Sequence, residues 1–346
     1  MKVAVVFDSP YPGWDHDDHE ARMHVETAPG YGDEAMPEYQ VAHALRARGH
    51  EVYLVGSQKD PSYVTQFLSE RPVDIVFNVT EGFRHADELD FLVPAILEAD
   101  GQRYTGAPPQ CLILTRNKAI SKKILRHHGV LVPAFESWRA GEKVPAKVKL
   151  RFPLIVKPLR LDASVGISRS SVVHDRDALA DRVAFIHERV GDAAIAEEFV
   201  EGRELYVSVM GNGRTLQILP VVEMIFDKQM PAEARIATHA VKWDADYCER
   251  NGIRTILARP ISKVAMERIH HACRTAYHAL WLRDYARFDL RLDAEDRVWL
   301  IEANANPYIC DGHEIAKAAR KAGMDYPTLV ENIIKIAQRR YKNGLH

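Results

Sequence analysis

The sequence predicts an α/β protein whose later parts are of the α+β type. Two observations lead to this fold class. In the first hundred residues, short apolar runs alternate with helical patterns, which is typical of a parallel sheet covered by helices. Beyond residue 113 the pattern changes, and after residue 204 neighbouring strands are joined by tight turns such as Gly211-Asn212-Gly213, which is typical of antiparallel pairing. A chain of 346 residues is also too long for one small core, so we expect several domains. The expected boundaries are 1–112, 113–200 and 201–346.

The first domain is expected to contain four strands and three helices. The strand patterns cover Val3–Phe7, Glu51–Val55, Val73–Val79 and residues 103–105, and the helical patterns cover Glu38–Arg48, Tyr63–Ser69 and Glu88–Glu98. Ligands of parallel sheets bind beyond the carboxyl ends of the strands. Here those ends are Asp8, Gly56 and Asn78.

The middle and last domains are expected to be richer in antiparallel strands. We predict, in order, a helix at Asn117–His128, strands at Phe152–Pro158 and Ser168–Val173, a helix at Arg176–Val190, strands at Ala194–Val200, Glu204–Met210 and Leu216–Phe226, and a helix at Ser262–Trp281. Two helices close the chain. The segment Phe226–Ala258 is rich in charge and lacks clear periodicity, so we expect a mobile lid there.

The stretch from Arg287 to Pro307 is the most informative part of the chain. Two alternating runs flank the polar turn Asp293–Asp296, which predicts a β-hairpin. Folding about this turn places Asp289 roughly opposite Glu302, with Asn304 on the same face. Carboxylate and amide oxygens suit hard cations such as Mg²⁺. The alternative interpretation is a surface hairpin held by cross-strand Asp–Arg pairs.

Three further segments have the chemistry to bind a nucleotide, although each has an ordinary alternative. Lys157 ends a strand and precedes a small-residue loop that contains Ser164, but it is also typical of an ordinary loop. Lys118 opens a helix, where anions bind, but it could equally be a solvated lysine. Residues 197–200 mix carboxylates with apolar side chains and could hold a purine or form a simple edge strand.

Composition excludes several classes of function. The net charge of −2 provides no basic field for nucleic acid or an anionic membrane. Apolar runs such as 216–222 are far shorter than the ~20 residues of a membrane span. The N-terminus does not resemble a signal peptide, and the four cysteines lack metal-type spacing. We therefore expect a cytoplasmic protein with reduced thiols and small-molecule partners. A homodimer is compatible with the sequence.

Taken in order, these motifs resemble the ATP-grasp superfamily, and most closely its D-alanine–D-alanine ligase branch. The resemblance runs from Val73 onward, and it is carried by Tyr104-Thr-Gly-Ala, Val156-Lys-Pro, Ser164-Val-Gly-Ile, Glu198-Phe-Val-Glu-Gly-Arg-Glu204, Arg287-Phe-Asp289 and Glu302-Ala-Asn304. Each motif alone is unspecific, whereas the ordered set is not. The fold that it implies is an ATP-grasp fold preceded by a parallel-sheet domain.

The resemblance also implies roles for individual residues. ATP phosphates would contact Lys118 and Lys157, under a loop that contains Ser164. The adenine hinge would consist of Glu197, Glu198, Phe199 and Val200, with Glu204 on the ribose. Two Mg²⁺ ions, replaceable by Mn²⁺, would be held by Asp289, Glu302 and Asn304. Arg287 would stabilise the transferring phosphate or the tetrahedral intermediate, and Lys242 is the family's lysine of the lid.

Four positions depart from the D-alanine pattern. No glutamate equivalent to the family's first-substrate contact is found after the first strand. The family's Gly-Ser-Ser-Val-Gly loop is Asp162-Ala-Ser-Val-Gly166, its Lys-Tyr pair is Lys242-Trp243, and its Ser-Pro-Gly is Asn306-Pro307-Tyr308. The ATP and metal residues are retained while the D-alanine residues are not.

These departures predict an ATP-dependent ligase that joins a carboxylate to an amine through an acyl phosphate, with substrates other than two D-alanines. The alternatives are D-alanine–D-alanine ligase itself and a non-enzymatic ATP-binding protein. Substrate contacts are expected from Glu81, Trp243, Asn306 and Tyr308, with Asp87 alternatively capping the next helix. The acidic, histidine-containing segment Asp15–Glu20 is expected to be a loop; the alternatives are a substrate-facing role or a separate metal site.

Overall fold

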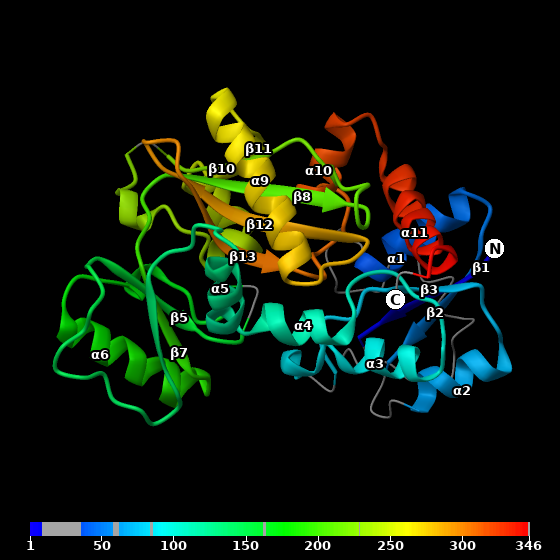
Figure 1. Ribbon diagram of the computed structural model, residues 1–346, viewed down its shortest axis with the longest axis horizontal. Helices are drawn as coiled ribbons and strands as arrows, with labels where there is room; N and C mark the ends of the chain where they lie inside the picture. Colours follow the sequence, from blue (N-terminus) through cyan, green and yellow to red (C-terminus); the bar gives the residue numbers. More distant parts are fainter. Residues whose placement is uncertain (9–35, 58–61, 84–85, 162–163, 228, 345–346) are drawn as a thin grey trace.

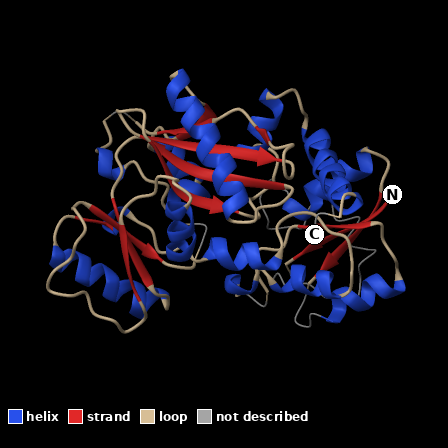
Figure 2. Ribbon diagram, viewed as in Figure 1, coloured by secondary structure: helices blue, strands red, loops and turns tan. Residues whose placement is uncertain are grey.

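The computed structural model describes residues 1–8, 36–57, 62–83, 86–161, 164–227 and 229–344. The described residues form three separate β-sheets, each with its own helices (Figures 1 and 2). The segment Asp15–Glu20 lies outside the described residues, and so do Asp162 and Ala163. No described helix has the length and apolar character that crossing a membrane would require. All four cysteines are described, and each is a free thiol.

The N-terminal sheet has the strand order β2-β1-β3, and both pairs of strands are parallel. Its strands are β1 (Lys2–Phe7), β2 (Glu51–Gly56) and β3 (Ile75–Asn78), and its helices are α1 (Pro37–Ala47), α2 (Ser62–Glu70) and α3 (Leu92–Ala99). The predicted parallel sheet is confirmed. The expected strand at residues 103–105 is reduced to a single parallel bridge between Tyr104 and Val76. A 3-10 helix, η2 (Asp87–Leu89), precedes α3, and Asp87 does not cap it.

The central sheet is antiparallel, with the order β4-β7-β5-β6. Its strands are β4 (Phe135–Trp138), β5 (Leu154–Pro158), β6 (Val172–Val173) and β7 (Ala194–Glu198). The helices are α4 (Pro109–Arg116), α5 (Lys118–His127) and α6 (Arg176–Phe185), which continues as the π-helix η4 (Ile186–Val190). The predicted strand Ser168–Val173 is mostly wrong. Ser168 and Ser171 form a capping box there, which stabilises the 3-10 helix η3 (Arg169–Ser171) instead.

The C-terminal sheet has the order β11-β10-β8-β12-β13, and β9 also pairs with β8. Its strands are β8 (Arg203–Met210), β9 (Gln217–Ile218), β10 (Val222–Ile225), β11 (Arg254–Leu257), β12 (Tyr285–Leu292) and β13 (Val298–Asn304). The single strand predicted at Leu216–Phe226 is therefore divided into β9 and β10. Pro220 lies in the gap, where it has no N–H to donate to a neighbouring strand.

The remaining helices cover this sheet and join it to the N-terminal unit. They are α7 (His239–Trp243), α8 (Ala245–Arg250), α9 (Lys263–Ala279), α10 (Glu314–Lys321) and α11 (Tyr326–Lys342), with the 3-10 helix η5 (Ala232–Ala234) before α7. Ser262 caps α9, so this helix begins one residue after the predicted start. Although α11 is the last helix, it packs against α1 and the first sheet (Figure 1). Its residue Arg340 forms a buried ion pair with Asp284, at 3.0 Å.

Candidate active site

Two adjoining cavities lie beside the central and C-terminal sheets, and they contain most of the site residues expected from the sequence. The first has a volume of about 90 Å³, and its lining includes Lys118, Lys157, Ser164, Glu197, Glu198, Phe199, Val200, Glu204, Asp289 and Glu302. The second has a volume of about 310 Å³, and its lining includes Glu81, Arg287, Asn304, Asn306 and Tyr308. Lys242, on α7, lines both cavities. Residues far apart in the sequence are thus brought to one place.

The hairpin of β12 and β13 supplies the carboxylates between the cavities. Asp289 lies directly opposite Glu302 in the register of the two strands, as expected from the sequence, and a bulge follows Asp289. The Nε and Nη2 atoms of Arg287 donate to the two oxygens of Asp289, at 2.8 and 3.2 Å. Asn304 donates its amide N–H to Asp289 at 3.1 Å. These three side chains therefore form one hydrogen-bonded group.

Glu302 is paired with a lysine from another element. The Nζ of Lys118, at the start of α5, lies 2.9 Å from Glu302 Oε1 and also donates to the carbonyl oxygen of Leu161 at 2.8 Å. Burial raises the pKa of the Glu302 carboxyl, but the charges of Lys118, Lys157 and Lys242 act in the opposite direction. The net effect is a pKa well below the ordinary value, so the carboxylate stays ionised across the physiological range.

The donor set of this hairpin fits a hard divalent cation. Asp289, Glu302 and Asn304 offer carboxylate and amide oxygens, which are the ligands that Mg²⁺ and Mn²⁺ prefer. The amide of Asn304 presents its oxygen to the site if it is rotated by half a turn. In the structure, Arg287 pairs with Asp289 and Lys118 pairs with Glu302. A cation that binds here would share these carboxylates with the two basic side chains.

Of the two glutamates that close β7, the first points into the protein interior. Glu197 has a side chain that is only 1% exposed, and its Oε1 atom lies 3.0 Å from Nζ of Lys157. The next residue, Glu198, pairs with Arg151 at 2.9 Å on the outside. Strand alternation places the two carboxylates on opposite faces of the sheet. Of the two glutamates, Glu197 is therefore the one that pairs with Lys157.

The loop after β5 contacts the segment predicted to be a lid. Ser164 adopts a left-handed backbone conformation, with φ of 62°, and its hydroxyl donates to the carbonyl oxygen of Ala237 at 2.6 Å. The segment contains η5, α7, α8 and β11, so it is more regular than its sequence suggests. Both segments line the first cavity at this contact. Movement of either one would open that cavity.

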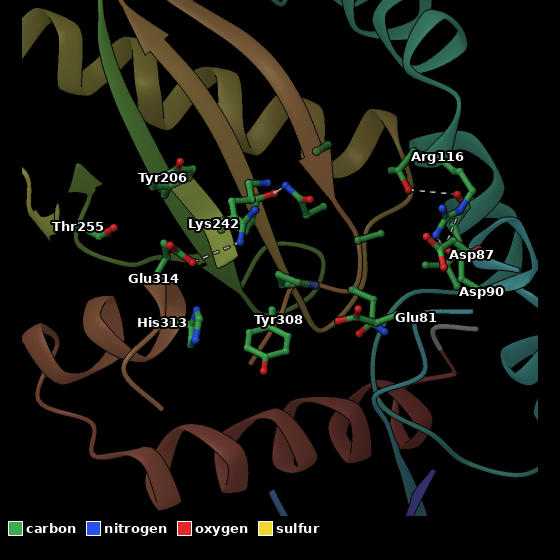
Figure 3. Close-up of a pocket in the computed structure, with 18 of the residues that line it drawn as sticks. Glu81, Asp87, Asp90, Arg116, Tyr206, Lys242, Thr255, Tyr308, His313 and Glu314 are labelled. Atoms are coloured by element: carbon green, nitrogen blue, oxygen red, sulfur yellow. Dashed lines mark hydrogen bonds and ion pairs between the residues drawn. The ribbon is translucent and has the colours of Figure 1, made fainter. Parts of the chain in front are cut away.

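The second cavity has charged groups at both ends, as Figure 3 shows. One end carries Glu81 with the buried ion pair of Asp90 and Arg116, at 2.6 Å. The other end carries Lys242 and Glu314, and Glu314 pairs with Arg287 at 3.4 Å. Such a cavity can hold a ligand that has both an ammonium and a carboxylate group.

Tyr308 forms part of the wall between these ends. Its ring lies edge-to-face on the ring of His313, with centroids 4.7 Å apart. Asn306 is fixed by two hydrogen bonds, one from Tyr285 at 2.9 Å and one to Thr80 at 2.7 Å. Trp243, the other expected substrate residue, ends α7, but its side chain lies outside the described part of the structure.

Comparisons with known proteins identify the family. Residues 125–335 match the family model described as the C-terminal part of D-Ala–D-Ala ligase. The chain is also 30% identical over 305 residues to the D-alanine–D-alanine ligase of Desulforudis audaxviator, which covers 87% of this chain and 92% of that protein. The chain belongs to the D-alanine–D-alanine ligase family. It is therefore an ATP-dependent ligase, which sets aside the non-enzymatic alternative.

Other relatives and solved structures agree with this assignment. The ligase is 34% identical over 313 residues to the uncharacterized protein y4sG of Sinorhizobium fredii, with 88% of each chain covered. The Bacillus anthracis D-alanine–D-alanine ligase complexed with ATP has a TM-score of 0.75 at 20% identity, over 99% of both chains. The VanG D-Ala:D-Ser ligase of Enterococcus faecalis has a TM-score of 0.67 at 17% identity, over 97% and 99% of the two chains. These likenesses confirm the ATP-grasp fold.

Several charged residues in or next to the two cavities were not expected from the sequence. They are Arg116, Lys122, His313, Glu314 and Lys317. For Lys122 a signal existed, because it follows Lys118 by four residues and so shares its helix face. No motif distinguishes the others from ordinary surface residues. Arg291, by contrast, shares a strand face with Arg287 and Asp289, and it pairs with Glu204.

Proposed function

We propose that this ligase joins a carboxylate to an amine through an acyl phosphate, with small amino acids or related carboxylates as substrates. The observation that supports this reaction most strongly is the pair of cavities that meet at Lys242. One cavity offers lysines to a polyphosphate, and the other offers opposite charges to a zwitterion. Lys242 would therefore be in reach of a phosphate that passes from one ligand to the other.

In the first step, an oxygen of the substrate carboxylate attacks the γ-phosphorus of ATP, and the bond to the ADP oxygen breaks. Lys118, Lys157 and Lys242 would neutralise the phosphate oxygens during this transfer. The loop that contains Ser164 and the facing segment near Ala237 would exclude water from the acyl phosphate. Residues 197–200 would hold the adenine, and Glu204 the ribose, in the same cavity.

A divalent metal completes the charge balance of this step. Asp289, Glu302 and Asn304 would hold Mg²⁺ or Mn²⁺, as two ions, and the metal supplies positive charge to the transferring phosphate. In the second step, a neutral amine attacks the acyl carbon, the C–O bond to phosphate breaks, and the nitrogen loses a proton. Arg287, which is fixed between Asp289 and Glu314, would stabilise the oxyanion that forms.

The substrates are proposed to differ from two D-alanines. Tyr308 supports this, because its bulky side chain lines the second cavity at the position where the family pattern has a glycine. Glu81 is proposed to contact the substrate ammonium at the opposite end. The second candidate is D-alanine–D-alanine ligase itself, which the likeness to the Desulforudis audaxviator enzyme favours. For either function we propose a cytoplasmic protein.

The two candidates differ in the response to D-alanine. We expect D-alanine to stimulate ADP release weakly at every concentration. The reason is that bulky side chains replace residues that make polar contacts in the D-alanine pattern. The measurement is ADP release across L- and D-amino acids, alone and in pairs, with mass analysis of the products. Efficient formation of D-alanyl-D-alanine at millimolar substrate would establish the second candidate. ADP release without any new amide would contradict both candidates.

Lys157 provides a separate test of the nucleotide site. Lys157→Ala is expected to raise KM for ATP and to lower kcat together, each about tenfold or more, because a phosphate contact acts in the ground state and the transition state. The matched control is Lys147→Ala, an exposed lysine of the same region. If both variants bind and turn over ATP like the parent protein, Lys157 has only a structural role.

A further inference from the structure

Lys122 is a buried lysine that lines neither of the two cavities. It lies on α5 one turn after Lys118, and its side chain is only 1% exposed. Its Nζ atom donates to the carbonyl oxygen of Ile301 at 2.7 Å and lies 3.3 Å from Glu197 Oε1. Lys122 therefore links α5 to both β13 and β7. It lies next to the first cavity, which is called the nucleotide cavity below because ATP is proposed to bind there.

Glu197 lies between Lys122 and Lys157. The same oxygen, Oε1, faces Lys157 at 3.0 Å and Lys122 at 3.3 Å, and the Glu197 side chain is itself only 1% exposed. Of these three residues, Lys157 and Glu197 line the nucleotide cavity. One carboxylate is thus shared between a lysine that can reach the nucleotide and a lysine that cannot.

This sharing leaves Lys157 with charge available to a ligand. If Glu197 faced Lys157 alone, the two would form a neutral pair, and the field of Lys157 on a phosphate would be largely cancelled. With two lysines around one carboxylate the group carries one net positive charge. Burial lowers the pKa of Lys122 to about 8, even though Glu197 acts to raise it. Burying an ammonium group costs desolvation energy, which an apolar side chain in the same space would avoid. The buried charge therefore indicates a role for Lys122.

We propose that Lys122 is a positioning residue for ATP, which acts through Glu197 on Lys157. It fixes the carboxylate from beneath and shares its negative charge, so that Lys157 keeps its direction and its positive charge toward the phosphates. The inference rests on the proposed nucleotide role of Lys157. The simpler alternative is that Lys122 only fastens α5 to β13 through the carbonyl of Ile301.

The test compares the affinity for ATP of the parent protein and its variants by calorimetry with Mg²⁺ present. Lys122→Met is expected to weaken ATP binding about tenfold while KM for the amino-acid substrates stays within twofold. The matched control is Lys123→Met, the exposed neighbour on the same helix, which should bind ATP like the parent. An unchanged affinity in folded Lys122→Met would overturn the inference.

A double variant distinguishes a role of Lys122 in positioning Lys157 from a role in holding α5 against β13. Because Lys122 acts through the carboxylate, Glu197→Gln and Lys122→Met/Glu197→Gln should bind ATP equally, within about twofold. A further tenfold loss in the double variant contradicts the proposal. This comparison holds even if Lys122→Met alone does not fold, since the double variant buries no unpaired carboxylate. Absence of ATP binding in the parent protein would instead remove the proposed function.

Discussion

Replacing Glu302 by Gln is expected to lower turnover about a thousandfold while the protein stays folded. The carboxylate is ionised, lies opposite Asp289, and is held at 2.9 Å by Lys118. Without its charge, the hairpin would lose a proposed ligand for the metal, and a loss of about 4 kcal/mol of transition-state stabilisation corresponds to three powers of ten in rate. Asp289→Asn should have an effect of similar size.

The measurement is ADP release at saturating ATP and Mg²⁺, together with circular dichroism and an unfolding curve. Glu295→Gln is the matched control, because Glu295 lies in the turn of the same hairpin with a side chain that is 66% exposed. Turnover of Glu302→Gln within tenfold of the parent, in a folded protein, would remove the metal assignment. A loss that the Glu295 variant shares would point to the hairpin fold rather than to the metal.

Replacing Arg340 by Met is expected to lower the free energy of unfolding by about 3–5 kcal/mol. The Arg340 side chain is 2% exposed and donates to both oxygens of Asp284, each at 3.0 Å, and to the carbonyl of Tyr104 at 2.7 Å. Its loss leaves the carboxylate of Asp284, which is fully buried, without its cation. The remaining donors to Asp284 are the backbone of Gly106 and the side chain of Asn212.

Urea denaturation measures this change, with Arg339→Met, the exposed neighbour on α11, as the control. Because the cost comes from an unpaired buried charge, the double variant Arg340→Met/Asp284→Asn should be less destabilised than the sum of the single variants. Additive losses would mean that the two side chains act independently, which contradicts the role given to this ion pair.

The parts of the fold that were predicted correctly depend on residues that are close together in the sequence. The register of Asp289 and Glu302 follows from a short turn and the alternation of two strands, so it could be counted directly. The start of α9 at its Ser262 cap follows in the same way. By contrast, β4 has only four residues and pairs with β7, which is distant in sequence, so nothing in its own residues distinguished it from a loop.

The candidate site shows the same division. The order of the motifs indicated which residues gather, but not which of them pair. Alternation along β7 implied that Glu197 and Glu198 face opposite ways, yet only the packing decides that Glu197 is the inner one. The pairing of Lys118 with Glu302 joins positions 184 residues apart, and no local pattern encodes such a contact.

The packing of α11 against α1 has a consequence for the synthesis of this protein on the ribosome. The N-terminal sheet and α1 are made first, but Val41 and Leu45 belong to a core that includes Leu329 and Ile333 of α11. That apolar face of α1 stays uncovered until α11 has been translated. The same core includes Met210 and Tyr285 of the C-terminal sheet, so the cores of both sheets are completed only when α11 is in place.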